Sequence, residues 1–236
     1  MRSIITAAFV FGLSAAASNA LTVNVTGTQA DFLAGKRMVA SENFETGFAV
    51  GRSKAYKTAV GTFRADKGGK TTIGDQGLGI VAGSIGSGRD GRFNTTPAPG
   101  TLYLDSYDAN RTRWFLDLPG SATGLGFFMT DLDDAGGNTE MTVFSDQGNK
   151  VHDLFDASSG STDLFNGNGN GKDIYVAIDF HGATVTKLAF KPNNGSDGIG
   201  FDDISAVAPV PLPAAGWMLI AGIGALFGFG RRKAAA

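Results

Sequence analysis

Short runs of Val, Ile, Phe, Tyr and Thr alternate with clusters of Gly, Asn, Asp and Ser along residues 21–208, and this pattern constrains the fold most strongly. β-Branched and aromatic residues favour extended backbone, whereas Gly, Asn and Asp accept turn conformations, so the alternation is typical of strands joined by turns. The run Ile174–Phe180 places apolar side chains at every second position, as a strand with one buried face does. No long amphipathic helix is indicated. The sequence therefore predicts an all-β body of two packed antiparallel sheets.

The same punctuation sets the expected strand positions. The Gly-rich region Gly68–Gly100 has no clear periodicity and is expected to form long loops. The expected strands are Thr22–Thr26, Glu42–Phe48, Ala55–Phe63, Thr101–Ser106, Arg113–Leu118, Gly124–Thr130, Glu140–Phe144, Lys150–Leu154, Ile174–Phe180, Val185–Lys191 and Ile199–Val207.

The first twenty residues have the order of an export signal. Arg2 supplies a positive charge, an apolar run extends from Ile4 to Leu13, and small residues precede Ala20. A signal peptidase accepts small side chains at such a site, so we expect residues 1–20 to be a signal peptide that is cut after Ala20.

The other end of the chain has three successive parts. A Pro-containing element is followed by an apolar stretch, 214–230, and then by a basic cluster. The stretch lies near the lower limit of ~17 residues for a transmembrane helix, and Lys and Arg beside such a span stay on the cytoplasmic side. We therefore divide the chain into the signal peptide, a body (21–208) and a tail (209–236). The residues of the two tail motifs are Val210, Pro211, Leu212, Pro213 and Ala214, then Arg231, Arg232 and Lys233.

This tail resembles the VPLPA variant of the PEP-CTERM sorting signal. The resemblance rests on the three-part order and covers only about residues 208–236. It implies export by a Gram-negative bacterium, inner-membrane anchoring before processing, and cleavage near the Pro-containing element by an exosortase. It indicates a cell-envelope or extracellular destination, and it leaves the role of the body open.

Composition and charge exclude several functions for the body. The chain has no cysteine, so disulfides, thiolate metal sites and a cysteine nucleophile are impossible. The body carries 16 Lys and Arg against 22 Asp and Glu, which gives 16 − 22 = −6. Residues 131–208 carry 4 basic and 13 acidic groups, or 4 − 13 = −9, which argues against a nucleic acid partner.

Three short segments of the body resemble a jelly-roll domain common in PEP-CTERM proteins, which is similar to carbohydrate-binding and concanavalin-like sandwiches. They are Asp197–Ile204, Glu42–Glu45 and Gly126–Asp131. The resemblance implies a two-sheet jelly-roll sandwich whose first and last strands pair. It also implies an acidic side chain of the closing strand near a structural calcium ion.

The densest acidic segment, Asp131–Asn138, has two interpretations. It begins like an EF-hand loop, but Ala135 and Thr142 stand where oxygen ligands belong, which excludes that motif. A turn whose Asp and Asn side chains bond their own backbone explains the segment and is the favoured interpretation. The alternative is a structural calcium site. Its ligands would be Asp131, Asp133, Asp202 and Glu45.

Catalysis has little support in the sequence. The only histidines are His152 and His181, and no Gly-x-Ser-x-Gly element surrounds a serine. A pair of carboxylates for glycoside cleavage remains an alternative, since Glu42, Glu45 and Glu140 are the only glutamates.

The leading interpretation is a non-enzymatic surface or matrix protein whose candidate ligand is extracellular polysaccharide. The alternatives are a glycan hydrolase and a permanently membrane-anchored surface protein. Aromatic side chains have two possible uses, stacking on sugar rings or packing in the core. The residues concerned are Tyr103, Tyr107 and Trp114.

Overall fold

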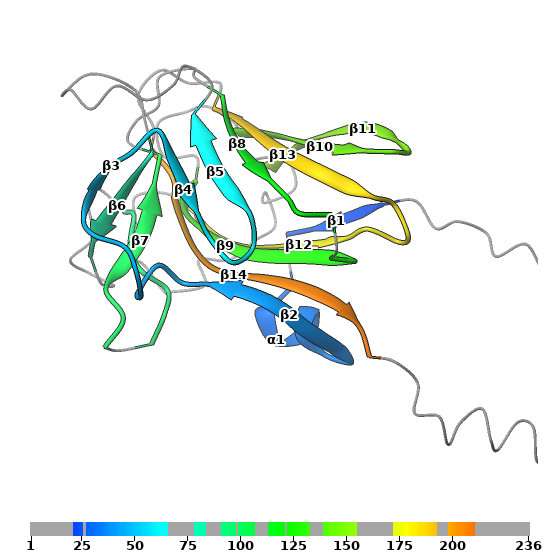
Figure 1. Ribbon diagram of the computed structural model, residues 1–236, viewed down its shortest axis with the longest axis horizontal. Coiled ribbons are helices and arrows are strands. Elements are labelled where there is room, and N and C mark those ends of the chain that lie inside the picture. The colour runs from blue at the N-terminus through cyan, green and yellow to red at the C-terminus, as the bar shows by residue number, and fades with distance from the viewer. Residues whose placement is uncertain are drawn as a thin grey trace, which may run out of the picture.

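The computed structural model describes residues 21–25, 27–65, 78–83, 91–97, 99–106, 113–120, 122–132, 139–154, 172–192 and 198–210. The predicted signal peptide lies outside these residues, and so does the predicted tail beyond Val210. Within the described part of the chain, two antiparallel sheets face one another, with the short helix α1 (Gln29–Leu33) on the outer side of one of them (Figure 1). The predicted two-sheet β-sandwich is confirmed.

The first sheet has eight strands in the order β1-β12-β9-β14-β7-β6-β3, and the eighth, β2, also pairs with β14. Its strands are β1 (Thr22–Asn24), β2 (Lys36–Glu42), β3 (Gly51–Arg52), β6 (Gly79–Ala82), β7 (Leu102–Asp105), β9 (Gly124–Leu132), β12 (Lys172–Asp179) and β14 (Gly200–Pro209).

The second sheet has six strands in the order β11-β10-β13-β8-β5-β4. Its strands are β4 (Ala55–Lys57), β5 (Thr62–Ala65), β8 (Trp114–Asp117), β10 (Thr139–Ser145), β11 (Gly148–Asp153) and β13 (Val185–Pro192).

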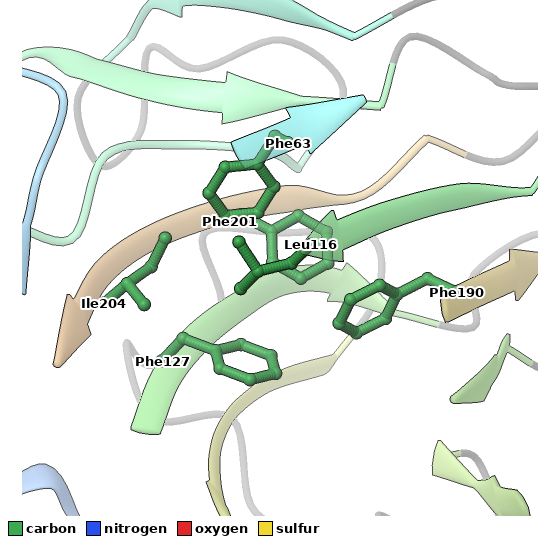
Figure 2. A pocket seen from close by; sticks show the side chains of 6 residues that line it. All are labelled: Phe63, Leu116, Phe127, Phe190, Phe201 and Ile204. Carbon is green, nitrogen blue, oxygen red and sulfur yellow. The ribbon is translucent and has the colours of Figure 1, made fainter. Parts of the chain in front are cut away.

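Aromatic and aliphatic side chains from both sheets fill the interior. Figure 2 shows Phe63 and Leu116 of the six-stranded sheet with Phe127 and Phe201 of the eight-stranded sheet, and the space among them is too small for water. The Trp114 ring stacks on Phe190 with centroids 4.0 Å apart. Dense packing of this kind leaves no room for a ligand among these six side chains.

Two of the three aromatic residues considered for sugar stacking are buried in the core. Trp114 and Tyr103 are fully buried, so their rings belong to the core and are not exposed for stacking on sugars. Tyr107 lies outside the described residues.

The predicted pairing of the first and last strands is wrong, and so are several strand positions. The first strand, β1, pairs with β12, and the strand that pairs with β14 at this edge is β2. The predicted strand Glu42–Phe48 is a bent segment, because Phe44 (φ 60°) and Gly47 (φ 83°) turn the chain and bury the Phe44 ring in the core. The predicted strand that began at Ala55 is a hairpin of β4 and β5.

That hairpin turns at Thr58, whose hydroxyl accepts hydrogen bonds from the N–H groups of Val60 and Gly61. A side chain at Gly61 would overlap the carbonyl of Asp117 on β8, so the close approach of β5 and β8 requires glycine there.

Strand β6 also differs from the sequence prediction, because it forms within the region Gly68–Gly100 that was expected to be loops.

Helix α1 begins with a capping box. The Thr28 hydroxyl accepts the N–H of Asp31, and the Asp31 carboxylate accepts the N–H of Thr28. Its Phe32 is buried against Tyr175 and Val207 on the outer face of the eight-stranded sheet. The Phe32 ring and the Tyr175 hydroxyl both lie close over Gly126 of β9.

Strand β14 divides one of its edges between two partners. Gly200 and Phe201 pair with β7, whereas the part from Ile204 to Pro209 pairs with β2. The register on β9 shifts between Asp202 and Ser205, and Asp203 takes φ 46°. This bulge separates β7 from β2 and directs two adjacent carboxylates toward neighbouring segments.

Candidate functional site

Three of the four predicted calcium ligands are described, and each contacts the segment 91–102. The Glu45 Oε1 atom accepts hydrogen bonds from the N–H groups of Thr101 (2.7 Å) and Leu102 (2.8 Å). It also accepts one from the side-chain amide of Asn94 at 2.8 Å. Glu45 therefore anchors both ends of this segment to the bend after β2.

Asp202 and Asp203 hold the middle of the same segment. The Asp202 Oδ2 atom accepts the N–H groups of Thr95 (2.7 Å) and Thr96 (3.2 Å). The hydroxyls of the same two threonines donate to the carboxylate of Asp203 at 2.9 and 2.8 Å. Each carboxylate is thus engaged with protein donors.

Asp202 is fully buried, which changes its proton affinity. The pKa of Asp202 is raised to about 8, mainly because the group is buried and in addition because the charge of Asp203 lies nearby. The N–H groups of Thr95, Asp203 and Thr96 act in the opposite direction by stabilising the carboxylate. Desolvation dominates, so a proton is retained on Asp202 near neutral pH.

Asp131 belongs to a buried ionic network. Arg92 contacts Asp131 at 3.7 Å (Nε to Oδ2) and Asp105 at 3.3 Å (Nη1 to Oδ1). The N–H of Asp131 donates to Asp173 at 3.3 Å. Asp133, the fourth predicted ligand, lies outside the described residues.

In the part of the chain that the structure describes, no group of three or more His, Cys, Asp or Glu side chains could hold a metal ion. Asp131, Asp202 and Glu45 converge on one segment, but they do so as partners of its Arg, amide and hydroxyl groups. A calcium site that includes Asp133 stays a prediction.

A groove of about 280 Å³ lies on the outer face of the eight-stranded sheet, between α1, β2 and β14. Ser41 and Ser205 are cross-strand neighbours, so their side chains lie on the same face. Asp203, from the bulge of β14, also lines it. The described lining residues are Gln29, Leu33, Met38, Ser41, Glu42, Asn43, Asp203, Ile204 and Ser205.

The groove combines hydrogen-bonding and apolar side chains. Two of the described lining residues, Glu42 and Asp203, carry carboxylates, and none of these described residues is Lys or Arg. The Glu42 Oε1 atom accepts the N–H of Phe44 at 2.9 Å, which fixes its orientation. Met38 is 51% exposed, so an apolar surface is available at the rim.

Sequence reasoning found only part of this groove. Glu42 and the closing strand with Asp203 were singled out, but Gln29, Leu33 and Met38 were not. The capping box at Thr28 is a signal that could have revealed α1, since Thr followed three residues later by an acidic residue marks a helix start. No local signal indicates that α1 packs beside β14.

The two histidines lie apart from the groove. His152 is on β11 in the other sheet, and its pKa is lowered by burial and by the charge of Lys150. His181 lies in the turn after β12, and its Nε2 atom is 3.0 Å from the Thr22 hydroxyl.

Among the described helices, none is long and apolar enough to cross a bilayer.

No protein-family model and no curated protein sequence matches the chain. Distant similarity exists to solved structures. The K2 cleaved adhesin domain of Lys-gingipain is 15% identical with a TM-score of 0.39, covering 70% of this chain and 96% of that domain. The K1 cleaved adhesin domain of Lys-gingipain from Porphyromonas gingivalis W83 is 11% identical with a TM-score of 0.39, covering 72% and 97%.

A third similar structure is the carbohydrate-binding module TmCBM61, solved in complex with β-1,4-galactotriose. It is 12% identical with a TM-score of 0.32, and the match covers 71% of this chain and 94% of that module. Because all three likenesses are distant, the residues of this chain must carry any functional proposal.

Proposed function

We propose that the chain is an exported surface or matrix protein whose jelly-roll body binds extracellular polysaccharide without cleaving it. The groove between α1, β2 and β14 carries this proposal, because it places amide, hydroxyl and carboxylate groups beside an exposed apolar side chain. Polar groups that converge next to apolar surface are typical of small-molecule and sugar sites.

The sorting part of the proposal rests on the two ends of the sequence. Signal peptidase removes residues 1–20, and an exosortase-like enzyme acts near Val210–Ala214. Val210 follows directly on β14 and is 54% exposed, so the junction between body and tail is accessible to an enzyme. Before processing, the helix 214–230 anchors the protein in the inner membrane.

A glycan hydrolase is the second candidate, because Glu42 and Asp203 line the same groove. Glycoside cleavage needs two carboxyl groups that face the scissile bond. Both carboxylates here already accept hydrogen bonds from the chain: Glu42 from Phe44, and Asp203 from Thr95 and Thr96. These bonds favour fixed binding groups over groups that exchange protons with a substrate.

A glycan array probed with the full-length chain in detergent tests the proposal. We expect binding to at least one class of polysaccharide and no release of reducing ends during long incubation. Release of reducing ends that Glu42→Gln and Asp203→Asn abolish would favour the hydrolase, and failure to bind any glycan would overturn the binding proposal.

A further inference from the structure

The outer face of the six-stranded sheet is not covered by any described helix or strand. Every described strand belongs to one of the two sheets, and α1 packs on the other sheet, against β2, β9 and β12 (Figure 1). Alternate side chains of the six strands enter the core, so the remaining ones point to the outer face. These outward side chains decide what the face binds.

The cross-strand registers arrange the outward side chains in rows that run from β11 to β4. In one row, Phe115 of β8 is the neighbour of Arg64 of β5. The row beside it consists of Asn149, Phe144, Lys187, Asp117, Thr62 and Lys57.

Cations cover the two aromatic rings of this face. The Lys187 ammonium lies 4.2 Å from the centroid of the Phe144 ring and 5.3 Å from that of Phe115. The Arg64 guanidinium lies 4.4 Å from the Phe115 centroid. Phe115 is only 8% exposed, so the face presents positive charge and little bare aromatic surface.

Two of the cations on this face are available to a ligand. Asp117 is the cross-strand neighbour of Lys187, but its two oxygens accept hydrogen bonds from Arg64 at 2.5 and 3.2 Å. Neither Lys187 nor Lys57 forms an ion pair with a carboxylate of the described residues. Three cations thus share one carboxylate across β13, β8, β5 and β4.

The spacing of these charges fits an extended acidic chain. Neighbouring strands lie about 4.8 Å apart, so the three strand spacings from Lys187 to Lys57 extend over roughly 14 Å. One small anion on a flat, solvated face gains little from a single cation. A chain with acidic groups on successive residues contacts several cations at once and binds more tightly.

The same face favours a polysaccharide over a nucleic acid. Single-stranded nucleic acids bind largely by stacking bases on open aromatic rings, and both rings here lie under cations. The net negative charge of the body also opposes a phosphate backbone. A uronate chain needs no open ring, and its hydroxyls can hydrogen-bond to Thr62 in the same row as the two lysines.

We propose that the outer face of the six-stranded sheet binds an acidic, uronate-bearing polysaccharide through Lys187, Lys57 and Arg64. This surface lies on the opposite sheet from the groove between α1, β2 and β14. It therefore goes beyond the proposed function and shares with it only the extracellular setting.

Biolayer interferometry of the full-length chain in a non-ionic detergent tests the inference, with polygalacturonate, a neutral galactan, poly-L-glutamate and single-stranded DNA as probes. We expect polygalacturonate to bind most tightly of the three polyanions, with an affinity that falls as the salt concentration rises. Lys187→Gln and Lys57→Gln should each weaken this binding about fivefold, the effect of one partly exposed charge pair, and about 25-fold together.

Two further variants separate a lost contact from a lost fold. Arg37→Gln is the matched control, because Arg37 is an exposed cation of β2 in the other sheet and its loss should leave the affinity unchanged. Asp117→Asn removes the carboxylate that the three cations share and releases Arg64, so it should tighten polygalacturonate binding about threefold. Misfolding cannot produce such a gain.

Polygalacturonate binding that survives the double lysine variant would overturn the assignment of this face. Equal binding of DNA or poly-L-glutamate would overturn the ligand class. Failure to bind polygalacturonate, with galactan still bound, would overturn the inference and leave the proposed function intact, whereas failure to bind either glycan would overturn both.

Discussion

Asp202 couples the stability of the body to pH. In the folded chain its pKa is raised to about 8 from 3.8, so between these values the folded state holds a proton that the unfolded state releases. Its contribution is fully present below about pH 4 and is lost as pH rises through about 8. The slope reaches at most about 1.4 kcal/mol per pH unit.

We expect the free energy of unfolding in urea to fall between about pH 6.5 and pH 8.5, and Asp202→Asn to flatten this dependence. The lower limit avoids His152, whose lowered pKa acts in the opposite sense, removing stability as pH falls below its usual 6.5. Stability that does not fall across the window in the unmodified protein would mean that Asp202 is ionised throughout, held by its three backbone N–H donors.

Gly126 is the second residue with a specific prediction. Gly126→Ala should destabilise the body by about 1–3 kcal/mol, because the methyl group meets the Tyr175 hydroxyl and the Phe32 ring. Thermal unfolding measures the loss. Adding Tyr175→Phe removes the closest atom and should restore part of the stability, whereas an additive double variant would show that the hydroxyl does not cross β9 at this position.

At the level of elements, the segment 91–102 depends on acidic groups far away in sequence. Glu45→Ala should lower the free energy of unfolding by about 1–3 kcal/mol, because it removes the acceptor of the N–H groups of Thr101 and Leu102. Glu45→Gln is the matched control, since its carbonyl oxygen can take the place of Oε1. We expect the same loss in calcium and in chelator.

Calcium tests the alternative role of these acids. A melting temperature that rises in millimolar calcium, and rises less in Asp131→Asn and Asp202→Asn, would support a calcium site that includes Asp133. An unchanged melting temperature would leave the acids as anchors of the segment 91–102.

The sequence predicts elements best where burial repeats at a regular interval. The alternation in Ile174–Phe180 matches β12, with Ile174, Val176 and Ile178 in the core. It misses β6, which is four residues long and lies in a Gly-rich region, and β2, which is largely exposed and depends on β14 for its pairing. Short elements of this kind are stabilised by partners more than by their own propensity.

The candidate site is less predictable for the same physical reason. Glu42 stands out in the sequence because it is one of only three glutamates, and Asp203 because it is adjacent to Asp202 in the closing strand. Their meeting with Gln29 and Met38 depends on how α1 packs against the sheet. The Asp202 contacts with Thr95 and Thr96 join residues about a hundred positions apart, and no local pattern encodes such distances.

For the whole molecule, we expect residues 21–210 to fold without either end. The core draws on both sheets and needs nothing from the predicted signal peptide or tail. A protein of residues 21–210 should show β-type circular dichroism and one cooperative thermal transition. A protein of residues 21–199, which lacks β14, is the control and should show no such transition.

Processing of the ends is a separate prediction. Intact-mass analysis of the protein from its native envelope should show loss of residues 1–20 and of the tail beyond the Pro-containing element. A mature chain that still ends at Ala236 in cells with an active exosortase would contradict the sorting interpretation.

Strand β14 is the last strand among the described residues and an inner strand of its sheet, between β9 on one side and β7 and β2 on the other. A ribosome makes it after every other strand of the described residues, so β2 must wait for a partner made more than 160 residues later. A chain that stalls or is cut before residue 200 leaves open strand edges that proteases and chaperones recognise. Completion of the fold therefore requires the whole body, and a truncated body is expected to be degraded rather than to persist as a partly folded sandwich.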